Sequence, residues 1–131
     1  MISKEEHVKH WVAQAEDDWE AVNILFKGKK YLQSLFFTHL VIEKLAKALW
    51  IKYNESNVPP KTHNVLYIMS QTPVKLDEKT NEFILNLNRF QIEGRYQEYL
   101  NQLSKICNEE FTNAVIIQAK ELKTWLIEKM Q

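Results

Sequence analysis

The sequence has very little glycine and proline: two glycines and three prolines in 131 residues, where average usage predicts about 15 of the two together. Such a chain lacks the turn residues that loop-rich β-sandwiches, collagen-like repeats and disordered linkers require, and it has no glycine-rich loop to hold a phosphate. Apolar residues make up 45% of the chain and charged residues 26%. The composition therefore predicts one globular domain, residues 1–131, that is mostly helical.

Net charge, cysteine pairs and long apolar runs are lacking as well. The 17 acidic and 17 basic side chains cancel, whereas a dedicated duplex-binding protein usually carries a basic excess. The single cysteine, Cys107, excludes an internal disulfide and fits a reducing compartment. The most apolar stretch, Leu35 to Ile42, is far shorter than the ~18 residues of a membrane span, and the acidic start of the chain is unlike a signal peptide. We therefore expect a cytoplasmic protein that makes no membrane contact.

Apolar residues recur at intervals of three and four along most of the chain, which predicts amphipathic helices. The first expected helix begins at a Ser3–Glu6 capping box and ends before Gly28 as its C′ residue. The second covers residues 31–53, and the third covers residues 63–71 with Thr62 as its N-cap. A fourth helix is capped by Asp77 and a last one by Asn108. A weaker period leaves residues 97–108 as either helix or loop. Because the first connection is short, we expect an all-α, up-and-down antiparallel bundle of four to five helices.

Polar residues on an apolar helix face need partners, so they mark candidate sites. His39 and Glu43 lie four residues apart on one face of the second helix, with Lys44 and Lys47 beside them. This group either binds an anion or a partner, or it is a self-satisfied His–Glu pair at a helix seam. Asp18 on the first helix either reaches Lys44 or Lys47 or lies in solvent.

Two further candidates lie at breaks between helices. His63 follows Thr62 in the first turn of the expected third helix, where the helix N-terminus favours a neutral imidazole that can form hydrogen bonds. The alternative is a loop histidine that helps to cap the helix. Arg95 and Tyr96 follow Gly94, and they combine an anion-binding guanidinium with a stacking ring and a hydroxyl. A structural arginine that caps helix carbonyls is the alternative at this position.

Metal and nucleophile patterns are missing. No glutamate is followed three residues later by histidine, as di-iron bundle sites require. His7 and His10 are close to the chain end, where a solvent-facing role is expected, and one cysteine cannot build a zinc finger. No serine lies on a nucleophile elbow. We therefore expect neither a metal nor another cofactor.

Taken together, these positions resemble the HEPN domain, a helical module of higher eukaryotes and prokaryotes. The resemblance covers residues 11–127. Its pieces, in chain order, are Trp11-x-x-x-Ala15-Glu16-x-Asp18, Ala21, Leu25, Tyr31, Phe36, His39-x-x-x-Glu43-Lys44-x-x-Lys47-Ala48, Pro60-x-Thr62-His63-x-x-Leu66 and Arg95-Tyr96.

The resemblance implies a nucleotide- or RNA-binding module, or a partner of a minimal nucleotidyltransferase in a pair like a toxin–antitoxin system. It also implies a homodimer with a groove that receives the ligand or the partner segment. The candidate ligand- or partner-binding residues are Asp18, His39, Glu43, Lys44, Lys47, His63, Arg95 and Tyr96.

The sequence departs from the family pattern around Arg95. Gly94 and Gln97 stand where the family has alanine and proline, and no histidine follows His63 anywhere in the chain. The family's ribonuclease motif, an arginine followed after four to six residues by histidine, is therefore missing, which favours a binding module over an enzyme. Two alternatives remain: an RNA-cleaving enzyme that uses Arg95 with His63 or His39, and a scaffold whose polar residues only fix the helix register.

Overall fold

The structure is a computed structural model that describes all 131 residues, and it contains helices but no strand. The elements are α1 (Lys4–Lys27), α2 (Tyr31–Tyr53), α3 (Val65–Ser70), α4 (Glu78–Leu87), a 3₁₀ turn η1 (Asn88–Phe90), α5 (Gln97–Ile106) and α6 (Glu109–Glu128). The expected all-helical bundle is confirmed. It has six α-helices, because the weakly periodic stretch 97–108 folds as the ten-residue α5.

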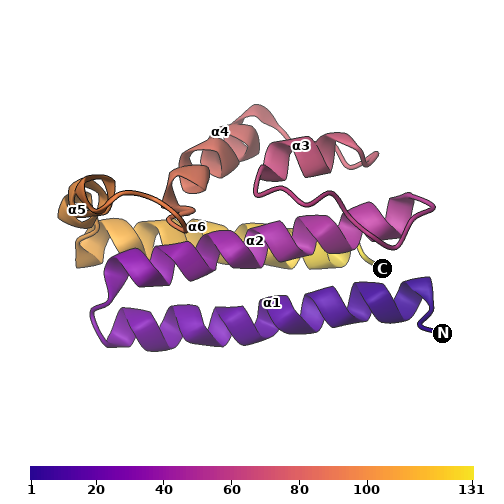
Figure 1. Cartoon of the computed structure of the whole chain (residues 1–131), viewed down its shortest axis with the longest axis horizontal. Helices are drawn as coiled ribbons and strands as arrows, with labels where there is room; N and C mark the ends of the chain where they lie inside the picture. Colours follow the sequence, from indigo (N-terminus) through magenta and orange to yellow (C-terminus); the bar gives the residue numbers. More distant parts are fainter.

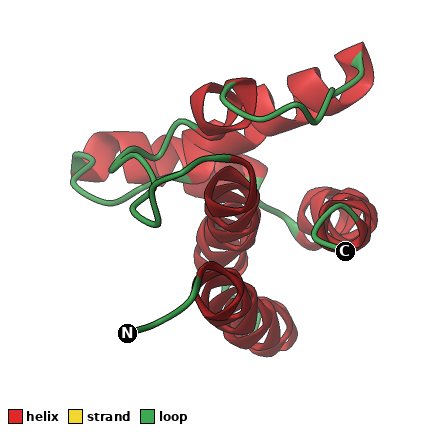
Figure 2. Cartoon of the chain, turned by 90° about the vertical axis from the view of Figure 1, so that its right-hand side faces the viewer, coloured by secondary structure: helices red, strands yellow, loops and turns green.

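Helix α2 is the element on which the others pack. Figure 1 shows α1 and α2 as long antiparallel neighbours, with α6 behind α2, α3 and α4 across the opposite side, and α5 at one end. The view along the long helices in Figure 2 separates α1, α2 and α6 from the α3–α4 layer. Helices α1, α3, α5 and α6 and the η1 turn all contact α2. Of its 23 residues 13 are buried, against two in α1.

One apolar cluster of 20 buried residues joins the six helices. Its centre is the row Leu35, Ile42, Leu45 and Leu49 of α2, all without exposed surface. A helix buried on nearly all sides has little room for polar residues, yet α2 also buries a histidine and a glutamate. Those two side chains are the starting point of the site. None of the helices combines the length and apolarity needed to cross a membrane.

Three of the four expected N-caps are confirmed. Ser3 accepts a hydrogen bond from the backbone N–H of Glu6 (3.2 Å), and Asp77 and Asn108 accept equivalent bonds of 2.7 Å. The third helix differs, because its N-cap is Asn64 and not Thr62. Asparagine is a strong N-cap residue, and Thr62 instead accepts from the N–H of Asn64 (3.1 Å) in the preceding turn.

The end of α1 also differs from the expectation in its backbone conformation. Gly28 is the C-cap with φ −81°, and the left-handed C′ residue is Lys29, with φ 62°. The N–H groups of Lys30 and Lys29 donate to the carbonyls of Leu25 (2.8 Å) and Phe26 (3.0 Å), which is the Schellman pattern. The Schellman motif needs a positive φ at the residue after Gly28, so Lys29 adopts the strained left-handed conformation.

Gly94 interrupts the chain before α5, as the broken apolar period predicts. Its φ of 76° lies in the left-handed region, and a Cβ added there would meet no atom within 4 Å. Glycine is therefore required by the backbone angle and not by close packing. The turn sends the chain from the end of η1 into the segment that carries Arg95.

Replacing Lys29 by glycine should stabilise the fold. Glycine removes the left-handed strain, which costs a side-chain-bearing residue roughly 1–2 kcal/mol, but it raises the entropy of the unfolded chain. We expect a net gain of about 0.5–1 kcal/mol in the free energy of unfolding, measured by urea denaturation. Lys27→Gly, inside the last turn of α1, is the control and should destabilise. A loss of stability in Lys29→Gly would contradict the strain assigned to this residue.

Candidate functional site

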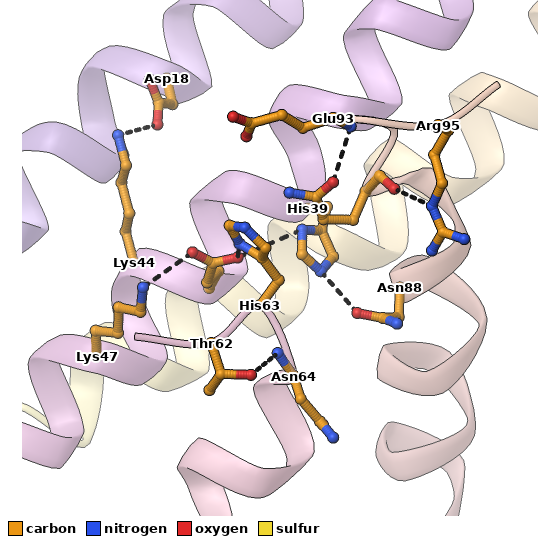
Figure 3. A network of polar contacts seen from close by, with 12 residues as sticks. Asp18, His39, Lys44, Lys47, Thr62, His63, Asn64, Asn88, Glu93 and Arg95 are labelled. Atoms are coloured by element: carbon orange, nitrogen blue, oxygen red, sulfur yellow. Dashed lines mark hydrogen bonds and ion pairs between the residues drawn. The ribbon is translucent and has the colours of Figure 1, made fainter. Parts of the chain in front are cut away.

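A buried carboxylate lies at the centre of the polar residues. Glu43 in α2 is only 4% exposed, and two side chains donate hydrogen bonds to its carboxylate oxygens. Lys47, one turn further along α2, donates to Oε2 at 3.2 Å, and Nδ1 of His63 lies 2.8 Å from Oε1. Figure 3 shows Lys47 on α2 and His63 on the loop that precedes α3. A buried carboxylate without such partners would be strongly destabilising, so the pairing holds the His63 loop against α2.

The contact with Glu43 defines the tautomer of His63. A carboxylate only accepts hydrogen bonds, so the proton is on Nδ1 and, in the neutral ring, Nε2 is left as an acceptor. The His63 side chain is 54% exposed, which keeps it within reach of a ligand. His63 lies two residues before α3, not in its first turn as the sequence pattern predicted. Glu43, and not the helix N-terminus, therefore orients the ring.

His39 lies deeper in the same network. It is 1% exposed, its Nε2 is 3.2 Å from Oδ1 of Asn88, and its Nδ1 faces Oε1 of Glu43 at 3.9 Å without a hydrogen-bond partner. Burial lowers the pKa of His39, although Glu43 and Asn88 act in the opposite direction. A neutral, buried His39 cannot touch a ligand, and its role is to connect α2 to η1.

The two lysines beside Glu43 are engaged in ion pairs. Lys44 lies 2.7 Å from Asp18 across the α1–α2 seam, which is one of the two contacts predicted for Asp18. Lys47 pairs with Glu43 and lies over the ring of Trp11, 5.5 Å from its centroid. These charges neutralise carboxylates within the bundle, and none of the three side chains of Asp18, Lys44 and Lys47 lines the neighbouring pocket.

A polar pocket of about 330 Å³ opens beside His63. Its wall comes from the loop before α3, from η1 and from the segment that follows η1. No apolar residue lines it. The lining residues are Thr62, His63, Asn64, Asn88, Gln91, Glu93 and Arg95.

The amide side chains present mainly donors to this pocket. The side-chain oxygens of Asn64, Asn88 and Gln91 are already occupied, by the N–H of Tyr67, by His39 and by the N–H of Glu93. Their NH₂ groups remain. Nε2 of Gln91 has no partner although the residue is only 5% exposed. A buried donor without a partner costs roughly 1–3 kcal/mol, so an acceptor supplied by a ligand would be favourable here.

Arg95 lines the pocket and Tyr96 does not. The Nε–H of Arg95 donates to the backbone carbonyl of Gln91 (3.2 Å), and its guanidinium lies 4.9 Å from the centroid of the Tyr99 ring. The terminal nitrogens are left for other acceptors. Tyr96 is 86% exposed and begins α5 as its N-cap residue. The structure thus brings Arg95 and His63 to one pocket, with His39 and Glu43 behind it.

Two larger hollows lack this chemistry. One, of about 590 Å³, lies between the start of α1 and the end of α6, and the ammonium groups of Lys4 and Lys52 at its edge donate to backbone carbonyls. The other, of about 400 Å³, lies between α4 and α6 and contains Phe83 and Trp125. Neither is lined by a buried polar atom without a partner. The polar pocket is therefore the candidate binding site.

Five of the seven lining residues were not candidate site residues in the sequence: Thr62, which was expected only as an N-cap, and Asn64, Asn88, Gln91 and Glu93. Asn64 and Asn88 lie near helix ends, where asparagine is common, so the sequence did not mark them as site residues. Gln91 and Glu93 precede the glycine break that drew attention to Arg95, and their proximity to Gly94 was the one available indication.

The fold and the pocket define a helical module with a donor-rich polar pocket and a buried histidine–glutamate pair. The sequence matches the HEPN domain family over residues 8–130, nearly the whole chain, and the protein belongs to this family. The resemblance seen in the sequence is confirmed. HEPN membership supports a nucleotide- or RNA-related role in general. No curated protein and no solved structure matches the chain.

Removing the charge of Glu43 should destabilise the bundle. In Glu43→Gln, Lys47 keeps its charge in a nearly buried position and His63 loses its carboxylate partner. We expect a loss of about 3 kcal/mol in the free energy of unfolding, measured by urea denaturation. Glu16→Gln is the matched control, because Glu16 is half exposed and pairs with Lys123 at 2.7 Å, and it should cost less than about 1 kcal/mol. Equal losses in both variants would contradict the assignment.

Burial of His39 should make stability depend on pH. The unfolded chain protonates this residue near pH 6.5, whereas the folded chain does so only at lower pH. The contribution of neutral His39 to the free energy of unfolding is therefore complete above about pH 7. It is lost as the pH falls, by at most about 1.4 kcal/mol per pH unit. Unfolding curves between pH 7.5 and 5 should show a shallower dependence in His39→Gln than in the wild type. His10→Gln, at an exposed position, should leave the slope unchanged.

Proposed function

We propose that this HEPN protein binds a nucleotide or RNA through the polar pocket and that the phosphate lies against Arg95 and the amide groups. The observation that carries the proposal is the buried, unpartnered Nε2 of Gln91 in a pocket that also contains the free guanidinium nitrogens of Arg95. Guanidinium and amide N–H groups together match the oxygens of a phosphate.

The surroundings of the pocket support a ligand with a base as well as a phosphate. Tyr96, next to Arg95 in the chain, exposes its ring to solvent. An exposed aromatic ring beside a phosphate-binding group offers a stacking surface that accepts any base. His63 adds one acceptor, Nε2, which the contact with Glu43 leaves available.

The proposal also names the proteins that this chain binds. A homodimer, a minimal nucleotidyltransferase partner and a role in a toxin–antitoxin-like pair follow from the HEPN resemblance, and family membership is what supports them. Co-purification of the chain with a nucleotidyltransferase encoded beside it tests this part separately from ligand binding.

RNA cleavage is the second candidate, because the pocket brings His63 and Arg95 together. In such a reaction Nε2 of His63 accepts the proton of a ribose 2′-hydroxyl as its oxygen bonds to the phosphorus, and Arg95 stabilises the charge that develops on the phosphate. The bond from phosphorus to the 5′-oxygen breaks, and this oxygen takes a proton from water. His39 is too deeply buried to serve as the base. Equal background cleavage of total RNA by the wild type, Arg95→Ala and His63→Ala would exclude this candidate.

Ligand binding is tested by thermal unfolding in the presence of AMP, ATP, GTP or short RNA. A ligand at 100 times its Kd should stabilise the fold by about 2.7 kcal/mol, seen as a rise in Tm. Arg95→Ala should weaken binding about tenfold or more, because it removes a charge-assisted contact. Lys105→Ala removes an exposed charge of the same sign in α5 and should bind like the wild type. An unchanged Tm with every ligand would refute the nucleotide proposal.

A further inference from the structure

Gln91, in the segment between η1 and α5, positions two charged residues of the pocket, Glu93 and Arg95. The side-chain Oε1 of Gln91 accepts from the backbone N–H of Glu93 (2.9 Å), and its backbone carbonyl accepts from Nε of Arg95 (3.2 Å). Gly94, with φ 76°, makes the turn between the two charged residues. Gln91 thereby fixes both ends of this pocket wall.

Glu93 and Arg95 point in different directions. In Figure 3 the carboxylate of Glu93 extends toward the side of α1, while the guanidinium of Arg95 extends toward Asn88. None of the ion pairs in the structure includes either residue. The pocket therefore has one end rich in donors, near Arg95 and Asn88, and one end with a free carboxylate that only accepts.

A phosphate matches only the first of these two ends. A carboxylate repels phosphate oxygens, but it accepts hydrogen bonds from sugar hydroxyls, as acidic residues do with ribose in dinucleotide-binding folds. Neither end of the pocket suits the base of a nucleotide, because the pocket of about 330 Å³ has no apolar lining residue against which a base could pack. A ribose with an attached phosphate carries both groups that the pocket recognises.

We infer that the pocket binds the ribose–phosphate unit of a ribonucleotide and that Glu93 selects against 2′-deoxyribonucleotides by accepting a hydrogen bond from the 2′-hydroxyl. This inference rests on the proposed function and adds the sugar and the specificity-determining residue. Because the base stays outside the pocket, ligands that differ only in the base bind with similar affinity. The unpartnered Nε2 of Gln91 contributes to binding of the phosphate and not to the choice of sugar.

The test is isothermal titration of the full chain with four probes: AMP, 2′-deoxy-AMP, ribose 5-phosphate and inorganic phosphate. In the wild type, 2′-deoxy-AMP should bind about tenfold more weakly than AMP, since one hydrogen bond to a charged group is lost. Ribose 5-phosphate should bind more weakly than AMP only by what stacking on Tyr96 contributes, about tenfold, and phosphate more weakly than either. Five-residue adenine RNA and DNA strands show whether the same ratio holds when the unit is part of a chain.

Three variants separate sugar selection from phosphate binding. Glu93→Ala should bring the AMP to 2′-deoxy-AMP ratio close to one, whereas Glu98→Ala, an exposed glutamate of α5, should keep the wild-type ratio. Gln91→Glu keeps the acceptor oxygen for the N–H of Glu93 but replaces the donor by a carboxylate oxygen. It should weaken AMP and 2′-deoxy-AMP equally. Circular dichroism and Tm establish that each variant folds.

The outcomes distinguish this inference from the proposed function. If ribo- and deoxyribonucleotides bind equally well to the wild type, or if Glu93→Ala keeps the ratio, sugar selection by Glu93 is refuted while nucleotide binding stands. A clear preference for one base, with ribose 5-phosphate inactive, also refutes it. If no probe and neither strand binds, the proposed function and this inference are both refuted.

Discussion

The carboxylate of Glu43 is buried in the helix on which the bundle packs, and a buried charge is tolerated only where donors and opposite charge reach it. Lys47 supplies one partner from the next turn of α2. The second has to come from elsewhere in the chain, and His63 provides it from a loop 20 residues away. The position of that loop, and with it one wall of the polar pocket, follows from the need to compensate this charge.

The helices could be predicted from the sequence because they depend on local signals. Spacing of apolar residues predicted α2 at residues 31–53, and Asp77 and Asn108 predicted the starts of α4 and α6. Local signals did not decide between two nearby residues that could each serve as the same helix cap. Thr62 and Asn64 are both good N-caps, and Gly28 and Lys29 both adjoin the end of α1. Which one serves depends on tertiary packing.

The site could be predicted only in part, for the same reason. His39 and Glu43 are four apart on one helix, so their proximity was visible in the sequence, and the pairing of Asp18 with Lys44 was one of two expected contacts. The grouping of His63 with Asn88 and Gln91 depends on how α3, η1 and α2 pack together, and no local pattern encodes it. Lys44 and Lys47 were expected in the groove, but they form ion pairs with Asp18 and Glu43 instead.

The central position of α2 has a consequence for amide hydrogen exchange. Amides in the middle of α2 are covered by four other helices and by η1, so they exchange only when the whole bundle opens. The stretch from Glu93 to Gln97 is exposed at every residue, and no atom packs against Gly94 where a side chain would be. Its amides exchange through small local openings. The wall of the pocket that contains Glu93 and Arg95 can therefore change conformation at a low free-energy cost, whereas α2, which lies behind the pocket, opens only with the whole bundle.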